Sequence, residues 1–124
     1  IDELTKRKRE ILNFYKEALY DEADVTLNPE LAGTVNGAWM PNVVFENNIG
    51  VSRAMLQEAF KAENIDARVF FYPLSELPMF DCPNPNSIAT SISQRAINLP
   101  SFHEITHEEQ SRVVNILKSL IPAR

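Results

Sequence analysis

The sequence has 124 residues, of which 44% are hydrophobic and 23% charged, and this predicts one globular domain with a core of its own. The net charge of −5 argues against a nucleic acid or an anionic membrane as partner, and no run of about 18 apolar residues predicts a transmembrane helix. Cys82 is the only cysteine, which excludes an internal disulfide and fits a reducing compartment, so we expect a cytoplasmic protein. Because the chain begins at Ile1, directly in a helical pattern, we expect the natural protein to start further upstream.

The first part of the chain predicts a helix followed by a loop. Residues 2 to about 20 form an amphipathic pattern whose apolar face carries Leu4, Ile11, Tyr15, Ala18 and Leu19. The basic run at residues 6–9 lies mostly on the other face, and because acidic neighbours dilute it we interpret it as a solvated surface. An Asn-Pro pair and two glycines predict a loop over residues 21–37.

A strand is predicted over residues 39–46, where apolar residues alternate and place Trp39, Val43 and Phe45 on one face. Pro41 cannot donate a backbone hydrogen bond, so we expect this strand to lie at an edge of its sheet or to carry a bulge.

A helix over residues 52–63 connects this strand to the next. Ser52 is its expected N-cap, Val51 and Leu56 form a hydrophobic staple, and Asn64 closes it in the left-handed region. The buried face is expected to carry Met55, Leu56, Ala59 and Phe60. A strand on either side makes this a β-α-β arrangement.

Residues 68–80 contain four aromatic residues, two prolines and one arginine. Residues 68–72 alternate as a strand with large apolar groups on both faces, so we expect the rest of the chain or a partner to cover both faces. Pro73 is expected to end the strand. Arg68 has two interpretations, a bidentate contact to a carboxylate or phosphate, or a structural role stacked on a tyrosine.

The last third of the chain predicts a turn-rich connection over residues 81–86, a short helix over 87–96 and an extended segment over 98–101. Ile88, Ile92 and Ala96 are expected on the apolar face of the short helix. Thr106 and Glu109 form a capping box that starts the final helix. Together these elements predict an α+β domain with helices packed on a short antiparallel or mixed sheet.

Residues 103–107 match the pattern H-E-x-x-H, in which two histidines one helical turn apart bind zinc and the glutamate acts as a base. The capping box starts the helix at Thr106 and leaves His103 in the preceding loop, and no third ligand is evident. We therefore interpret His103 and His107 as exposed histidines beside a helix start, with a zinc protease as the alternative.

The sequence alone predicts no catalytic machinery. Cys82 has no helix N-terminus beside it to activate its thiol, and three scattered glycines cannot form a phosphate-binding loop. Most lysines flank charged residues on solvent faces and do not indicate a Schiff-base site. We predict no catalytic, cofactor-binding or metal-binding residue in this chain.

The sequence resembles the C-terminal part of the DegT/StrS nucleotide-sugar aminotransferases, and within them the perosamine synthase-like members. The resemblance rests on residues 65–75 (IDARVFFYPLS), on LPMF at 77–80, and on NLPS at 98–101 ahead of THEEQ at 106–110. The family carries the corresponding stretches G-I-x-x-R-P-F-F-Y-P-L-H/S, x-P-x-[FY] and N-L-P-S ahead of its last helix. The resemblance covers nearly the whole chain.

This resemblance implies a fold-type I, pyridoxal phosphate-dependent homodimer that transfers an amino group from glutamate to a keto-sugar nucleotide, for a perosamine-like sugar of O-antigen or another cell-surface polysaccharide. It implies that residues 1–124 are a single small C-terminal domain, which the helix at 2–20 links to an N-terminal large domain holding the cofactor and the Schiff-base lysine. The chain alone is then expected to bind no cofactor and to be inactive. By the same resemblance, Arg68, Tyr72 and Ser75 are expected near the substrate.

Three positions depart from the family pattern: Asn64 replaces a glycine, Val69 replaces a proline, and Ser75 stands where many members have histidine. The alternative function is a free-standing, non-catalytic interaction domain that binds a protein through residues 68–80.

Overall fold

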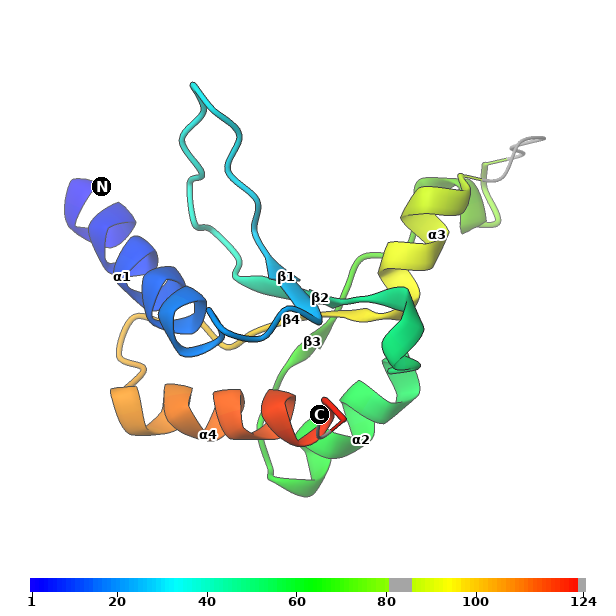
Figure 1. The fold of residues 1–124 in the computed structure, drawn as a ribbon. Helices are drawn as coiled ribbons and strands as arrows, with labels where there is room; N and C mark the ends of the chain where they lie inside the picture. Colours follow the sequence, from blue (N-terminus) through cyan, green and yellow to red (C-terminus); the bar gives the residue numbers. More distant parts are fainter. Residues whose placement is uncertain (81–85, 123–124) are drawn as a thin grey trace.

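The computed structural model describes residues 1–80 and 86–122 (Figure 1). Its helices are α1 (Asp2–Ala18), α2 (Arg53–Ala62), α3 (Ser87–Gln94) and α4 (His107–Ser119). Its strands are β1 (Val25–Leu27), β2 (Asn42–Phe45), β3 (Arg68–Val69) and β4 (Ala96–Asn98). The expected connection over residues 81–85, with Cys82, lies outside the described residues.

The sheet has the strand order β1-β2-β4-β3, and every neighbouring pair is antiparallel. This confirms the α+β class with a short antiparallel sheet. The β-α-β arrangement is also confirmed as β2-α2-β3, with β4 inserted between its two strands. The edge position predicted for the strand after Pro41 is wrong, because β2 lies between β1 and β4. Pro41 precedes the strand and takes part in pairing only through its carbonyl, which accepts from the Leu99 N–H at 2.8 Å.

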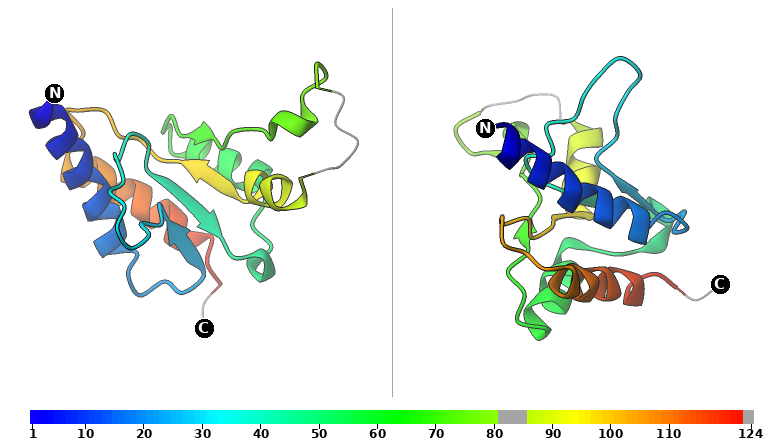
Figure 2. Two further views of the ribbon diagram at one scale, coloured as in Figure 1. Left: turned by 90° about the horizontal axis from the view of Figure 1, so that it is seen from above. Right: turned by 90° about the vertical axis from the view of Figure 1, so that its left-hand side faces the viewer.

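The core lies between one face of the sheet and helices α1, α2 and α4 (Figures 1 and 2). Its largest fully buried side chains include Tyr15 on α1, Phe45 on β2, Phe60 on α2, Ile97 on β4 and Leu117 on α4. Since side chains alternate along a strand, the register that puts Val43 beside Ile97 turns a polar row to the other face. That row consists of Asn42, Asn98 and Arg68.

The predicted caps of α2 and α4 are confirmed. The Met55 N–H donates to the Ser52 hydroxyl oxygen at 3.3 Å, which caps α2. Asn64 follows α2 with φ of 54°, in the left-handed region that asparagine tolerates better than most residues. At α4, Thr106 and Glu109 form the full capping box.

Several sequence predictions are wrong in extent or in burial. The segment expected to be a loop over 21–37 contains β1, and the strand expected over 68–72 ends at Val69. The helix expected over 87–96 ends at Gln94, and Ala96, expected on its apolar face, begins β4 instead. Met55 and Ile88 were expected to be buried, but both are exposed, and Ser93 is the buried residue of α3.

The segment between β1 and β2, residues 28–41, projects from the sheet on the side away from α4 (Figures 1 and 2). Asn28 closes its base, because its amide donates to the Met40 carbonyl at 3.0 Å and accepts from the Asn42 N–H at 2.8 Å. The strand predicted over residues 39–46 is therefore too long, because Trp39 lies in this segment outside β2, with 70% of its surface exposed.

Candidate functional site

Arg68 is the first residue of β3 and is paired with Asn98 across the ladder. Its guanidinium forms an ion pair with Asp66 at 2.8 Å, in which both side chains are 76% exposed. An ion pair this exposed contributes little free energy, so Arg68 can exchange its partner for an incoming anion. The alternative interpretation of Arg68 was a structural arginine stacked on a tyrosine. In the described residues, Arg53 and not Arg68 makes this contact.

A cavity of about 420 Å³ lies beside Arg68. Its polar wall includes Asp66, Arg68, Asn98, Ser101 and Arg112. Its apolar wall comes from Met40, Ile65, Leu99, Pro100, Phe102, Ile105 and Val113. An apolar cavity with a few convergent polar groups is the usual form of a small-molecule site.

Tyr72 lies beyond the end of β3, and 58% of its surface is exposed. The Arg53 guanidinium carbon lies 4.0 Å from the centre of its ring, a cation–π contact. Arg53 is in turn held by the Ser93 carbonyl, to which its Nε donates at 2.9 Å.

Ser75 lies in a short 3-10 turn, Leu74–Glu76. Its hydroxyl oxygen is buried and has no hydrogen-bond partner within residues 1–80 and 86–122. The next residue attaches the turn to α3, because Glu76 Oε1 accepts from the Thr90 hydroxyl at 2.5 Å.

The structure therefore separates the three expected substrate residues. Arg68 lines the cavity, whereas Tyr72 and Ser75 share the following loop and are not among the residues that line it. Their contacts to a substrate stay a prediction.

The rest of the described chain covers the aromatic stretch only in part, so cover by a partner stays a prediction. Phe71 is 58% exposed, and its ring stacks on Trp39 with centres 6.4 Å apart and planes at 15°. We define the aromatic surface as the exposed apolar residues Trp39, Phe71, Tyr72, Leu74, Met79 and Phe80. Five of these residues lie in residues 71–80, and Trp39 joins them through its contact with Phe71. Exposed apolar residues grouped in this way are typical of a surface that contacts another protein or domain.

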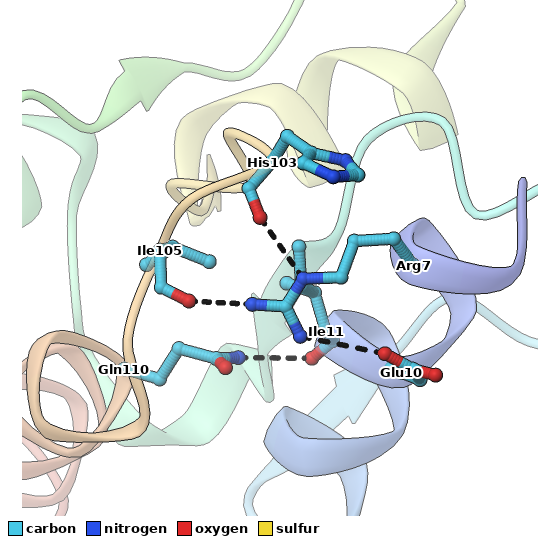
Figure 3. Close-up of polar contacts among 6 residues, drawn as sticks. All are labelled: Arg7, Glu10, Ile11, His103, Ile105 and Gln110. Atoms are coloured by element: carbon cyan, nitrogen blue, oxygen red, sulfur yellow. Dashed lines mark hydrogen bonds and ion pairs between the residues drawn. The ribbon is translucent and has the colours of Figure 1, made fainter. Parts of the chain in front are cut away.

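The H-E-x-x-H segment is not a helical zinc site. His103 lies in a turn before α4, where its carbonyl accepts from Arg7 Nε at 2.9 Å (Figure 3). Arg7 Nη2 also donates to the Ile105 carbonyl at 2.6 Å, and Gln110 Nε2 donates to the Ile11 carbonyl at 3.1 Å, so α1 fixes this segment (Figure 3). His107 begins α4 and stacks on Phe14, with ring centres 5.1 Å apart.

Glu109, close to this segment, has a structural role in the capping box of α4. The Thr106 N–H and hydroxyl donate to Glu109, and these hydrogen bonds lower the pKa of that carboxyl. Within residues 1–80 and 86–122 there is no group of three or more His, Cys, Asp and Glu side chains that could hold a metal ion. None of the helices in the same residues is long and apolar enough to cross a membrane.

The lysines of this chain do not fit the Schiff-base site of a pyridoxal phosphate enzyme. A Schiff-base lysine requires a desolvated pocket, and the five lysines, all in the described part of the chain, are exposed or half-buried. Lys8 donates to Ser101 and Lys118 pairs with Glu22.

Sequence reasoning missed Arg53 and the contact between Trp39 and Phe71. Arg53 directly follows the Ser52 cap of α2, and a charged side chain at this position usually faces solvent. No pattern of neighbouring residues indicates its contact with the Tyr72 ring.

The comparisons with known proteins agree with the fold. A model of the DegT/DnrJ/EryC1/StrS aminotransferase family matches residues 1–118. The chain is 32% identical over 126 residues to the protein EpsN of Bacillus subtilis, covering 97% of this chain and 32% of EpsN. It is 27% identical over 122 residues to GDP-perosamine synthase of Vibrio cholerae, covering 96% of this chain and 33% of that protein.

Among solved structures, DesI in the presence of its TDP-sugar product has the same fold, with a TM-score of 0.79 and 24% identity, over 93% of this chain and 30% of DesI. The chain thus spans about a third of the length of the relatives it matches. The resemblance drawn from residues 65–80 and 98–110 is confirmed. Since the family model matches nearly its whole length, this chain belongs to the DegT/DnrJ/EryC1/StrS aminotransferase family.

Proposed function

We propose that residues 1–124 are the small C-terminal domain of a pyridoxal phosphate-dependent aminotransferase that transfers an amino group from glutamate to a keto-sugar nucleotide. The observation that carries this proposal is the match of an aminotransferase family model to residues 1–118 of a chain that spans a third of its relatives. Because the lysines of this chain do not fit a Schiff-base site, the cofactor is assigned to a large domain outside the chain, joined through α1.

The proposed product is an amino sugar of the perosamine type, used in a cell-surface polysaccharide. One relative is named GDP-perosamine synthase, and a structural neighbour is described with its TDP-sugar product. We further propose that the whole enzyme is a cytoplasmic homodimer, and that the large domain or the second subunit covers the aromatic surface, whose exposed rings are costly to leave in water.

In this proposal, the domain contributes to binding of the nucleotide sugar. Arg68 is exposed and held by one exposed ion pair, so a phosphate can replace Asp66 and accept two N–H groups from the guanidinium. Arg53 covers Tyr72, whose remaining exposed surface can stack on a base or a sugar. Ser75 supplies a hydroxyl that has no partner within the described residues.

The test is to express the full-length protein that contains this chain and to incubate it with glutamate, pyridoxal phosphate and a panel of GDP- and TDP-linked keto sugars. Mass spectrometry is expected to detect an aminated sugar nucleotide from at least one member of the panel. If no member is aminated and the protein instead forms a stable complex through residues 68–80, the chain is an interaction domain and the proposal is wrong.

The substrate role of Arg68 is tested in the same enzyme. Arg68→Ala is expected to raise the KM for the sugar nucleotide about tenfold, the value of one good charge-assisted contact, with little change in the KM for glutamate. Lys118→Ala, which removes another cation from a partly exposed ion pair, is the control and leaves both constants unchanged. Unchanged KM and kcat in Arg68→Ala would exclude the contact.

A further inference from the structure

We propose that Arg53 is a positioning residue that holds the loop of residues 70–77, and with it Tyr72 and Ser75, in the orientation that receives the sugar nucleotide. The inference rests on the proposed function for the identity of the ligand, and on the contacts of Arg53 for the mechanism.

The first step is that Arg53 is fixed at its own position. It is the first residue of α2, directly after the Ser52 cap. Its Nε and Nη2 both donate to the Ser93 carbonyl, Nε at 2.9 Å. Ser93 is 2% exposed and lies in the last turn of α3, where carbonyls lack helical partners and the helix dipole favours a cation. Arg53 therefore connects the start of α2 to the end of α3.

The second step is that this fixed guanidinium carries the Tyr72 ring. The guanidinium carbon lies 4.0 Å from the ring centre, which is the geometry of a cation–π contact. Tyr72 follows β3 by three residues and belongs to neither a helix nor a strand, so backbone pairing does not hold it. The side-chain contact to Arg53 therefore determines where the ring lies.

The third step is that the loop is attached on both sides of Ser75. Tyr72 lies on Arg53, and Glu76 accepts a hydrogen bond from Thr90 of α3 at 2.5 Å. Between these attachments, the Ser75 hydroxyl oxygen is buried without a partner in the described part of the chain. A buried hydroxyl without a partner is unfavourable unless another group satisfies it, and a loop fixed in advance lowers the entropy cost of binding that group.

The third guanidinium nitrogen of Arg53 is shielded from solvent. Arg53 Nη1 is also buried and has no hydrogen-bond partner within residues 1–80 and 86–122. A lysine cannot replace this residue, because one ammonium group does not offer both a planar surface for the ring and a fork of donors for the Ser93 carbonyl.

The test uses hydrogen exchange and steady-state kinetics on the full-length protein with Arg53→Lys, which retains the charge, and with Tyr72→Leu, which removes the ring. Both variants are expected to exchange the amides of residues 71–77 about tenfold faster than the wild type, with unchanged exchange in α4. Arg7→Lys is the matched control, since Arg7, like Arg53, makes two guanidinium hydrogen bonds to backbone carbonyls but has no cation–π contact in the described part of the chain, and it leaves the exchange of residues 71–77 unchanged.

In the kinetic assay, Arg53→Lys is expected to raise the KM for the sugar nucleotide about tenfold and to leave the KM for glutamate unchanged. A residue that only stabilised the fold would lower the active fraction and hence kcat, with both KM values unchanged. In the Tyr72→Leu background, Arg53→Lys is expected to add little, because the two residues act through one contact.

The outcomes distinguish the two proposals. Wild-type exchange and wild-type KM in Arg53→Lys would overturn the positioning role even if the enzyme is an active sugar aminotransferase. If Arg53→Lys speeds exchange in the loop but no keto-sugar nucleotide is aminated by the wild type, the proposed function is wrong and the loop does not serve that substrate.

Discussion

Replacing Tyr15 with phenylalanine would remove one oxygen atom from the centre of the core. The Tyr15 ring is fully buried, and its hydroxyl donates to the Pro100 carbonyl at 2.9 Å, which connects α1 to the segment after β4. Phenylalanine fills nearly the same volume, so no cavity forms. The expected loss at neutral pH is therefore about 1–2 kcal/mol, the net value of one hydrogen bond plus the carbonyl that remains without its partner.

The same hydroxyl gives a pH dependence of known sign. Burial raises the pKa of Tyr15 well above its ordinary value of 10.0. Above about pH 10, the ordinary tyrosine pKa, the unfolded chain loses the proton of Tyr15 while the folded chain keeps it. The wild type therefore loses about 1.4 kcal/mol of stability for each further pH unit. Tyr15→Phe has no such dependence. The variant should therefore become as stable as the wild type at about pH 11.

The assay is urea denaturation followed by circular dichroism, at several pH values between about 7 and about 11. Tyr20→Phe is the control, because Tyr20 is 85% exposed. The free energy of unfolding of Tyr20→Phe should equal that of the wild type at every pH. If Tyr15→Phe and the wild type are equally stable at neutral pH and remain parallel at alkaline pH, the hydroxyl is not buried and bonded as the structure shows.

Three further predictions concern the ends of α2 and α4. Hydrogen bonds from Thr106 lower the pKa of Glu109, so the wild type should be more stable than Glu109→Gln above the ordinary glutamate pKa and should lose this advantage as the pH falls through the lowered pKa. Urea midpoints of both proteins at about pH 7 and about pH 3 measure the difference in stability. A difference that is the same at both pH values would contradict the prediction. Asn64→Ala should lower stability by about 1 kcal/mol because φ is 54°, whereas Asn64→Gly should be neutral; equal melting temperatures for both variants would exclude strain there. Removal of metal with a chelator should leave the melting temperature unchanged. If elemental analysis finds one equivalent of zinc in the wild type and none in His103→Ala, the zinc interpretation is supported instead.

The helix ends were predictable because each depends on residues close together in sequence. Ser52 caps α2 with the N–H three residues later, and the capping box of α4 is likewise local. Asn64 follows the same rule, since its backbone conformation depends on its own side chain. These local signals predicted the ends of α2 and the start of α4. Because α4 begins after Thr106, they also argued against a helical zinc site that includes His103.

The strands were predicted less well because their pairing depends on distant residues. β1 has only three residues and exists because Val25 pairs with Phe45, which a sequence pattern over residues 21–37 cannot reveal. β3 ends at Val69, which pairs with Ile97, and Phe70 does not continue the pairing although Ala96 belongs to β4. The length of β3 thus depends on a strand that comes later in the chain. Pro41 was misplaced for the same reason, since β4, the new neighbour of β2, comes more than fifty residues later in the chain.

Arg68 was indicated as an anion contact by its own sequence context, whereas Tyr72 and Ser75 were indicated only through the family resemblance. It indicated Arg68, Tyr72 and Ser75, but not that Arg68 lines a cavity from which the other two residues are absent. Arg53 could not be found from sequence, because its contacts join α2, the end of α3 and the loop after β3.

The position of β4 between β2 and β3 has a consequence for synthesis of the protein. On the ribosome, β1 and β2 can pair early, but β2 and β3 have no neighbour between them until residues 96–98 have emerged. The nascent chain therefore exposes one edge of β2 while residues 46–98 are being translated. We expect that truncation before Ala96 yields aggregated protein, and that a chaperone which shields open strand edges improves the yield of the complete chain.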